Sequence, residues 1–146
     1  MIKNVDHANV IHYGFESLII KTGTNGLNKP SCIKILKEEF PSKETLSQLE
    51  NEFEICSKTK CSCIRKAFKK ENQDDHVAIF LEYIEGRDLN KILASQKLTL
   101  SQQCVLAIDI TTALTTLHKE NIFHGRVHPA NILIEQATNK VFFIDF

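Results

Sequence analysis

The residues best suited to chemistry lie near the C-terminal end of the chain. The stretch His124–Leu133 reads HGRVHPANIL, and Ile144-Asp145-Phe146 follows it. Asn131 offers an amide oxygen and Asp145 a carboxylate, and hard oxygen donors of this kind are the ligands that Mg²⁺ prefers. Arg126 carries a guanidinium that is protonated at any accessible pH and has no acceptor. Arg126 therefore cannot take a proton from a substrate as a general base.

The first half of the chain contains short β-rich runs with glycine-containing turns between them. Ser31–Leu36 alternates around a single cation, Lys34, and predicts a strand. Two earlier runs predict a hairpin, and a second turn follows it. These segments are the strands Val10–Tyr13 and Leu18–Lys21, the turn at 14–17 and the turn at 23–28.

Residues 43–58 predict an amphipathic helix. Ser42 is a plausible N-cap. The apolar residues recur at helical spacing and are Leu46, Leu49, Phe53 and Cys56. Glu52 lies in this helix between Glu50 and Glu54, so on its own it is compatible with a solvated acidic face.

The remaining segments predict further strands and two helices. Two strands are joined by a polar turn. A short helix then follows, with Asp88 as a possible N-cap, and a long helix follows with Thr99 or Ser101 as its N-cap. The apolar stripe of the long helix comprises Cys104, Ala107, Ile108, Leu114 and Leu117. The predicted segments are the strands Ile64–Lys69, His76–Tyr83 and Lys140–Ile144, the turn at 70–75, and the helices Leu89–Ser95 and 101–119.

The composition is that of a globular protein with balanced charge. Hydrophobic residues make up 42% and charged residues 25% of 146 residues, with 18 basic against 18 acidic side chains. This balance gives no argument for nucleic acid, and no apolar run reaches the length of a membrane span. We therefore expect no nucleic acid and no membrane among the partners. The N-terminus lacks the apolar stretch of a secretory signal, so we expect a cytoplasmic protein.

The five cysteines favour reduced thiols over a disulfide framework. Cys56, Cys61 and Cys63 cluster, but a zinc site would need a fourth ligand. Cys32 and Cys104 lie among apolar residues and are expected to behave as small buried hydrophobes.

The chain resembles the protein kinase superfamily of the serine/threonine type. His124–Leu133 is similar to the catalytic loop H-R-D-L-x-x-x-N, and Asp145-Phe146 to the first two residues of D-F-G. The resemblance implies an α+β, protein kinase-like fold with a five-stranded antiparallel small lobe, an αC helix and the first part of a helical large lobe. Residues 1–84 would form the small lobe with its nucleotide cradle and hinge, and residues 85–146 a partial, incomplete large lobe. We then expect the apolar faces of helix 101–119 and strand 140–144 to be exposed.

The resemblance also implies ATP and Mg²⁺ as cofactors and a role for each matching residue. Lys34 would pair with Glu52 to contact phosphates, while Asn131 and Asp145 would hold the metal. Arg126 stands where the family has its catalytic base, and Lys34 and Asn131 would be its catalytic companions. The other nucleotide contacts would be Gly14 and Ile19 of the glycine-rich loop, Leu81 as gatekeeper, Glu82, Tyr83 and Ile84 of the hinge, and Asp88 at the ribose.

The departures from the family pattern leave the activity open. His128 replaces the usual lysine of the loop and could itself act as a base near neutral pH. Arg126 could stabilise a transferring phosphate electrostatically. His124 taken alone is more often a packed structural histidine than a catalyst. One hypothesis is an ATP/Mg²⁺-binding domain with impaired phosphoryl transfer to protein Ser/Thr.

Two further hypotheses remain. One is a non-catalytic pseudokinase module that recruits or regulates a partner protein. The other is a relic of a small-molecule phosphotransferase, whose loop H-G-D-x-H-x-x-N is similar to His124–Asn131. Finer similarities favour the kinase-like domain that opens some large multidomain signalling ATPases and sensor histidine kinases. The segments that carry them are 35–42, Asn51–Ile55 and Ile64–Phe68.

Overall fold

The computed structural model describes residues 9–14, 16–24, 30–38, 40–73 and 76–146. The chain divides into two compact units. The first comprises Met1–Ser57 and Lys66–Tyr83, and the second comprises Lys58–Arg65 and Ile84–Phe146. The segment Lys58–Arg65 therefore belongs with residues that lie far from it in the sequence.

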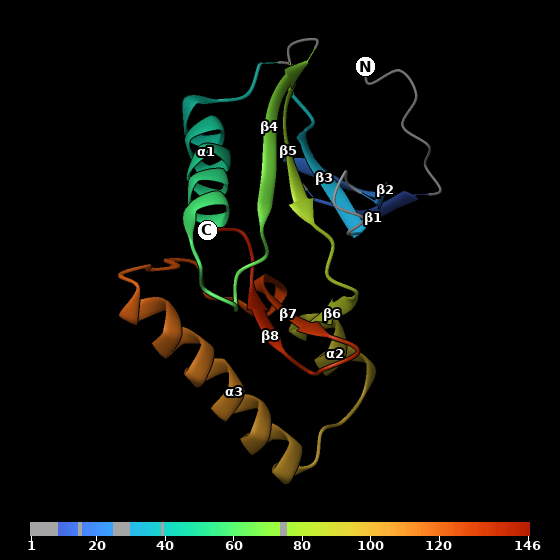
Figure 1. Ribbon diagram of the computed structural model, residues 1–146. Coiled ribbons are helices and arrows are strands. Elements are labelled where there is room, and N and C mark those ends of the chain that lie inside the picture. The colour runs from blue at the N-terminus through green and yellow to red at the C-terminus, as the bar shows by residue number, and fades with distance from the viewer. Residues whose placement is uncertain (1–8, 15, 25–29, 39, 74–75) are drawn as a thin grey trace. The chain divides into compact units, whose positions relative to one another are not determined.

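The first unit contains a five-stranded sheet whose strands all pair antiparallel (Figure 1). Its spatial order is β1-β2-β3-β5-β4. The strands are β1 (Val10–Tyr13), β2 (Ser17–Thr24), β3 (Pro30–Leu36), β4 (Ala67–Gln73) and β5 (His76–Glu82). The predicted five-stranded antiparallel small lobe is thus confirmed.

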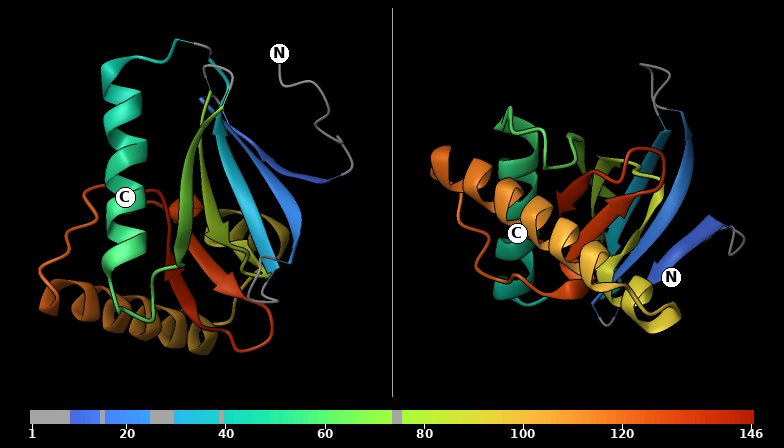
Figure 2. Two further views of the ribbon diagram at one scale, coloured as in Figure 1. Left: turned by 45° about the horizontal axis from the view of Figure 1, so that its top comes forward. Right: turned by 90° about the horizontal axis from the view of Figure 1, so that it is seen from below.

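Helix α1 (Lys43–Lys58) lies beside this sheet (Figures 1 and 2). The Ser42 hydroxyl accepts a hydrogen bond from the amide of Thr45 at 3.1 Å, as predicted for an N-cap. Leu49, Glu52 and Cys56 are the buried residues of the helix. Their spacing of three and four positions places them on one face, so the carboxylate of Glu52 is held on the apolar side.

Two segments of the first unit differ from the sequence-based prediction. β4 begins at Ala67 rather than Ile64, and it continues to Gln73 through residues predicted as a turn. β4 is an edge strand, and edges tolerate lysines and polar side chains because one side of the strand lacks a neighbour. β2 likewise extends to Thr24. Residues 25–28 and 74–75 of the two predicted turns lie outside the described residues.

The second unit contains a three-stranded antiparallel sheet of order β6-β7-β8. Gly86 allows its own backbone to lie against that of Ile134, because a Cβ at position 86 would lie only 2.2 Å from the carbonyl oxygen of Ile134. A short 3₁₀ helix, Pro129–Asn131, precedes β7. The other elements are β6 (Gly86–Asp88), α2 (Leu89–Ser95), α3 (Leu100–Lys119), β7 (Ile132–Glu135) and β8 (Val141–Phe143).

Helix α3 begins with a capping box. The Thr99 hydroxyl accepts from the amide of Gln102, and the Gln102 side chain accepts from the amide of Thr99. The predicted cap at Thr99 is confirmed. No helix of the described ranges, α3 included, is long and apolar enough to cross a membrane.

The core of the second unit lies between β8, α3 and the segment Cys63–Arg65. Phe143 and Leu117 are fully buried and Ile64 is 2% exposed. A parallel bridge joins Ile64 to Phe143, and the amide of Phe143 donates to the carbonyl of Cys63 at 2.9 Å. The apolar residues of β8 are therefore covered.

This burial corrects two predictions about exposure. The strand at 140–144 was expected to expose its apolar face, but Val141, Phe142 and Phe143 are all buried because the segment before β4 covers them. Cys104 was expected to be buried and is exposed on α3. Cys32 is buried as predicted. The predicted exposure of the apolar face of α3 is observed only in part, since Ile108 is 63% exposed whereas Leu117 is fully buried.

Two alanine substitutions on α3 test which face carries its packing. We expect Leu117→Ala to lower the free energy of unfolding by about 3 kcal/mol, because a fully buried leucine leaves a cavity. Ile108→Ala should change it by less than about 0.5 kcal/mol, since Ile108 is exposed on the same helix. Urea unfolding monitored by circular dichroism measures both, and equal effects would contradict the assigned core.

Candidate functional site

A buried ion pair links β3 to α1 in the first unit. The ammonium of Lys34 lies 2.6 Å from a carboxylate oxygen of Glu52, and their side chains are 12% and 2% exposed. Charges this deeply buried are tolerated only when paired, because desolvation of either ion alone is costly. The pair therefore fixes the direction of the lysine side chain, and it fixes the position of α1 against the sheet.

Strand β2 and its turn lie next to Lys34. Ile19 is the register partner of Lys34 in the β2–β3 pair and is 8% exposed. The amide of Gly14 donates to the carbonyl of Ser17 at 2.9 Å and closes the turn between β1 and β2. A Cβ on Gly14 would lie only 3.2 Å from that carbonyl oxygen and 3.1 Å from the ring of His12. This tight approach favours glycine.

The predicted hinge residues use much of their hydrogen-bonding capacity within the sheet. Leu81, the predicted gatekeeper, is fully buried on β5. The amide of Glu82 donates to the carbonyl of Lys66 at 2.7 Å, and the Glu82 carboxylate accepts from the amide of Lys66 at 3.3 Å. The amide of Tyr83 donates to the carbonyl of Pro30. The side chain of Glu82 thus joins β5 to the start of β4.

The ring of Tyr83 is covered by the ammonium of Lys21, which lies 4.2 Å from the ring centroid. Such a cation–π contact orients an aromatic ring without burying it completely. Ile84 follows Tyr83 and is the first residue of this stretch that belongs to the second unit, where it is 9% exposed.

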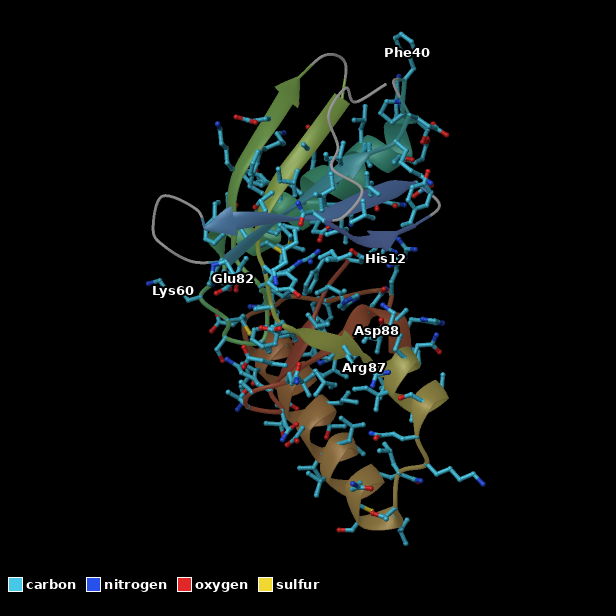
Figure 3. All side chains as sticks on the ribbon, turned by 90° about the vertical axis from the view of Figure 1, so that its right-hand side faces the viewer. His12, Phe40, Lys60, Glu82, Arg87 and Asp88 are labelled. Atoms are coloured by element: carbon cyan, nitrogen blue, oxygen red, sulfur yellow. The ribbon has the colours of Figure 1, made fainter. Side chains whose placement is uncertain are left out.

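In the second unit Asp88 is the N-cap of α2. Its carboxylate accepts from the amide of Lys91 at 2.8 Å and lies 2.8 Å from the Lys91 ammonium. Burial opposes ionisation, but the hydrogen bonds and charge of Lys91 outweigh it and lower the pKa of Asp88 below its usual value. Figure 3 shows Asp88 at the junction of β6 and α2. The capping role predicted as the alternative is present in the structure.

His124 braces the loop that precedes the 3₁₀ helix. Its Nδ1 accepts from the amide of Arg126 at 3.3 Å, so the proton of a neutral ring lies on Nε2, which then donates to the carbonyl of Ile144 at 2.9 Å. The ring also lies 4.5 Å from that of Phe146 and 5.5 Å from that of Phe143, measured between centroids. The imidazole is 5% exposed and serves as a packed structural group.

Arg126 and His128 are both exposed. The carbonyl of Arg126 accepts from the side-chain amide of Asn131 at 3.1 Å. The Nδ1 atom of His128 accepts from the amide of Ala130 at 3.2 Å and caps the 3₁₀ helix. The backbone of this loop is therefore fixed by its own side chains, while the guanidinium of Arg126 stands at its surface.

Asn131 and Asp145 are brought close together by the backbone. The amide of Ile144 donates to the carbonyl of Asn131 at 3.1 Å, directly before Asp145. Because the Asn131 nitrogen donates to Arg126, its amide oxygen is the atom left to face a cation. Asp145 has φ of 63°, in the left-handed region that aspartate tolerates better than most residues. The two side chains are a donor set that suits Mg²⁺.

Arg65 is a buried residue for which no functional role was predicted. Its side chain is 6% exposed, and its guanidinium lies 4.0 Å from the Asp145 carboxylate. The pairing follows from the bridge between Ile64 and Phe143, which runs Arg65 alongside the residues that end in Asp145. One signal was available, because an arginine directly after Cys63-Ile64 interrupts an apolar run.

The thiols of Cys61 and Cys63 lie 2.8 Å apart and are buried. Burial and the neighbouring thiol raise the pKa of Cys63 to about 12. A zinc ligand must be a thiolate, so this environment disfavours metal binding. Within the described ranges no group of three or more His, Cys, Asp or Glu side chains is arranged to hold a metal ion.

Comparison with known proteins identifies the family. The sequence profile of the protein kinase domain matches residues 2–146. The chain belongs to the protein kinase family. A probable serine/threonine-protein kinase of Clostridium perfringens is 31% identical over 132 residues, which are 88% of this chain and 19% of the relative. An Aurora kinase of Yarrowia lipolytica is 31% identical over 123 residues, covering 84% of this chain and 33% of the relative.

The kinase fold is also found among solved structures. The PknI kinase domain of Mycobacterium tuberculosis, crystallised as a double mutant, superposes with a TM-score of 0.75 at 19% identity. The match covers 94% of this chain and 56% of the PknI chain. This kinase domain therefore spans only part of the length of the relatives that it matches.

A double replacement tests the buried ion pair of the kinase domain. Glu52→Ala should destabilise the fold by about 3 to 5 kcal/mol, because the ammonium of Lys34 loses its carboxylate in a buried setting. The apolar double variant Lys34→Met/Glu52→Leu should recover most of this loss. Glu50→Ala is the control, since its pair with Lys70 is exposed and is expected to contribute less than about 1 kcal/mol.

Urea unfolding measures the free energy of unfolding of the parent and of the three variants. A Glu52→Ala variant as stable as Glu50→Ala would contradict the assigned energetic role of the pair.

The capping carboxylate of the kinase domain predicts a pH dependence. Asp88→Asn keeps an acceptor for the Lys91 amide but removes the charge. Because the folded pKa of Asp88 is lowered, its charge stabilises the fold fully above the unfolded pKa, near 3.9, and this contribution is lost as pH falls through the folded value. The parent should therefore be more stable than the variant at pH 6, and the gap should shrink below pH of about 4. A gap that stays constant between pH 6 and 3 would refute this.

Proposed function

We propose that this kinase domain binds ATP with Mg²⁺ and that its phosphoryl transfer is severely impaired. The observation that carries the proposal is the buried Lys34–Glu52 pair at 2.6 Å, together with an arginine where the family has its base. A lysine held by a buried carboxylate is preorganised to contact phosphates, whereas a mobile lysine would lose more conformational freedom on binding.

The remaining residues have roles that follow from family membership. Gly14, Ile19 and Leu81 would contact the nucleotide, with the backbone of Glu82, Tyr83 and Ile84 at the adenine edge. Asp88 would lie at the ribose, and its carboxylate also caps α2. Asn131 and Asp145 would hold Mg²⁺, which neutralises phosphate charge when bound. Among these roles, those of Lys34 and Glu52 have the strongest structural support.

The loss of transfer follows from the chemistry of Arg126 and His128. A guanidinium cannot accept the proton of a hydroxyl, and general-base catalysis is typically worth a factor of 10² to 10⁴. His128 is no ready substitute in this geometry, because its Nδ1 is engaged by the amide of Ala130. Any residual transfer would be to serine or threonine hydroxyls of proteins, by similarity to the probable serine/threonine-protein kinase of Clostridium perfringens.

A thermal-shift titration with ATP and Mg²⁺ tests the proposal. At ATP concentrations of about 100 times Kd, binding should stabilise the folded chain by about 2.7 kcal/mol. The double variant Lys34→Met/Glu52→Leu should lose this shift, because it keeps a packed apolar pair but removes the phosphate contact. Lys70→Met is the control, since Lys70 lies at the edge strand and pairs only at the surface with Glu50.

A cooperative melt of the parent without any ATP shift would overturn the proposal. That outcome would favour an interaction domain that acts independently of nucleotide.

A further inference from the structure

The side chain of Arg65 is charged and buried. Only Glu52 and Arg65 among the charged residues of the described part are more than nine-tenths buried. Glu52 has its counter-ion in Lys34. The role of the Arg65 guanidinium is not explained by the nucleotide contacts proposed above.

The geometry assigns Arg65 a fixed place next to the candidate metal site. The segment Cys63–Arg65 is held to β8 by the Ile64–Phe143 bridge and by the hydrogen bond from Phe143 to Cys63. These contacts leave little freedom at the backbone of Arg65. Its Nη2 atom lies 4.0 Å from Oδ1 of Asp145, a contact between opposite charges that is longer than a hydrogen bond.

We propose that Arg65 is a built-in countercharge for Asp145 and weakens the binding of a divalent cation there. A positive charge about 4 Å from a carboxylate repels a second cation and already neutralises part of the negative charge. Arg65 is buried and its segment is paired with β8. Its guanidinium therefore cannot move away from Asp145 as an exposed side chain could. The inference rests on the proposed function for the identity of the metal ligands, but the charge pair itself can be tested without nucleotide.

The proposal implies that the cation next to Asp145 is the Arg65 guanidinium when no metal ion is bound. In this chain the carboxylate is partly satisfied before any metal arrives, so the fold should be stable without metal. Nucleotide binding should then depend only weakly on Mg²⁺. Replacing Arg65 by an uncharged side chain should restore a strong dependence on the metal.

A double-mutant cycle without metal or nucleotide tests the pair. Asp145→Asn should lower the melting temperature of the parent by about 4 °C or more, because Arg65 loses a countercharge. The same change should have a much smaller effect in an Arg65→Leu background. Asp109→Asn is the matched control, since Asp109 is exposed on α3 in the same unit. Equal effects of Asp145→Asn in both backgrounds would overturn the proposal.

If Arg65→Leu does not fold cooperatively, the pair is tested by comparing the melting temperatures of Asp145→Asn and Asp109→Asn in the parent background. A shift no larger than that of the control would count against the pair.

Binding of Mn²⁺ alone provides the second measurement. Titration followed by the electron paramagnetic resonance signal of free Mn²⁺ should give an affinity about tenfold higher for Arg65→Leu than for the parent. Arg65→Lys keeps the charge and should bind Mn²⁺ as weakly as the parent. Lys97→Leu removes an exposed charge elsewhere in the unit and should have no effect. Equal affinities of the parent and Arg65→Leu would refute the inference.

Loss of the ATP shift in the parent would refute nucleotide binding and leave the metal-free cycle interpretable. The two proposals can therefore fail separately.

Discussion

The position of α1 depends on one buried interaction, the ion pair between Lys34 and Glu52. Neither charge is tolerated on the inner face of its element alone, so the strand and the helix must be adjacent for either to be buried. Glu52 also shares its helix face with Leu49 and Cys56, and the apolar packing of these neighbours excludes the water that would otherwise solvate the pair. The same contact gives the small lobe its shape and gives the lysine its direction.

Local patterns predicted most of the fold because local causes produce it. The alternation around Lys34, the cap at Ser42 and the box at Thr99 each depend on residues within a few positions of one another. The start of β4 and the burial of β8 were mispredicted, and each depends on a partner distant in sequence. The exposure of Cys104 was also mispredicted. The charged and polar residues of β4 favour a turn when the sequence is considered alone. They are compatible with a strand because β4 lies at the edge of the sheet.

The candidate site shows the same division between local motif and distant contact. The motif around His124 marked Asn131 and Asp145, and the backbone bond from Ile144 to Asn131 brings them close together. The motif could not indicate Arg65, which reaches Asp145 only through a bridge between segments from opposite halves of the chain. The departure from the family pattern at Arg126 can be recognised from the sequence. The positive charge of Arg65 next to Asp145 can be recognised only from the structure.

The bridge between Ile64 and Phe143 also has a consequence for the order in which the chain acquires structure. The first unit is interrupted by a segment whose partner strand, β8, is synthesised much later than the segment itself. Contacts between such distant segments carry a large loop-closure cost and form late. During synthesis the apolar stretch around Ile64 therefore stays uncovered after α1 has emerged, and the nascent chain presents a binding surface for chaperones until β8 pairs with it.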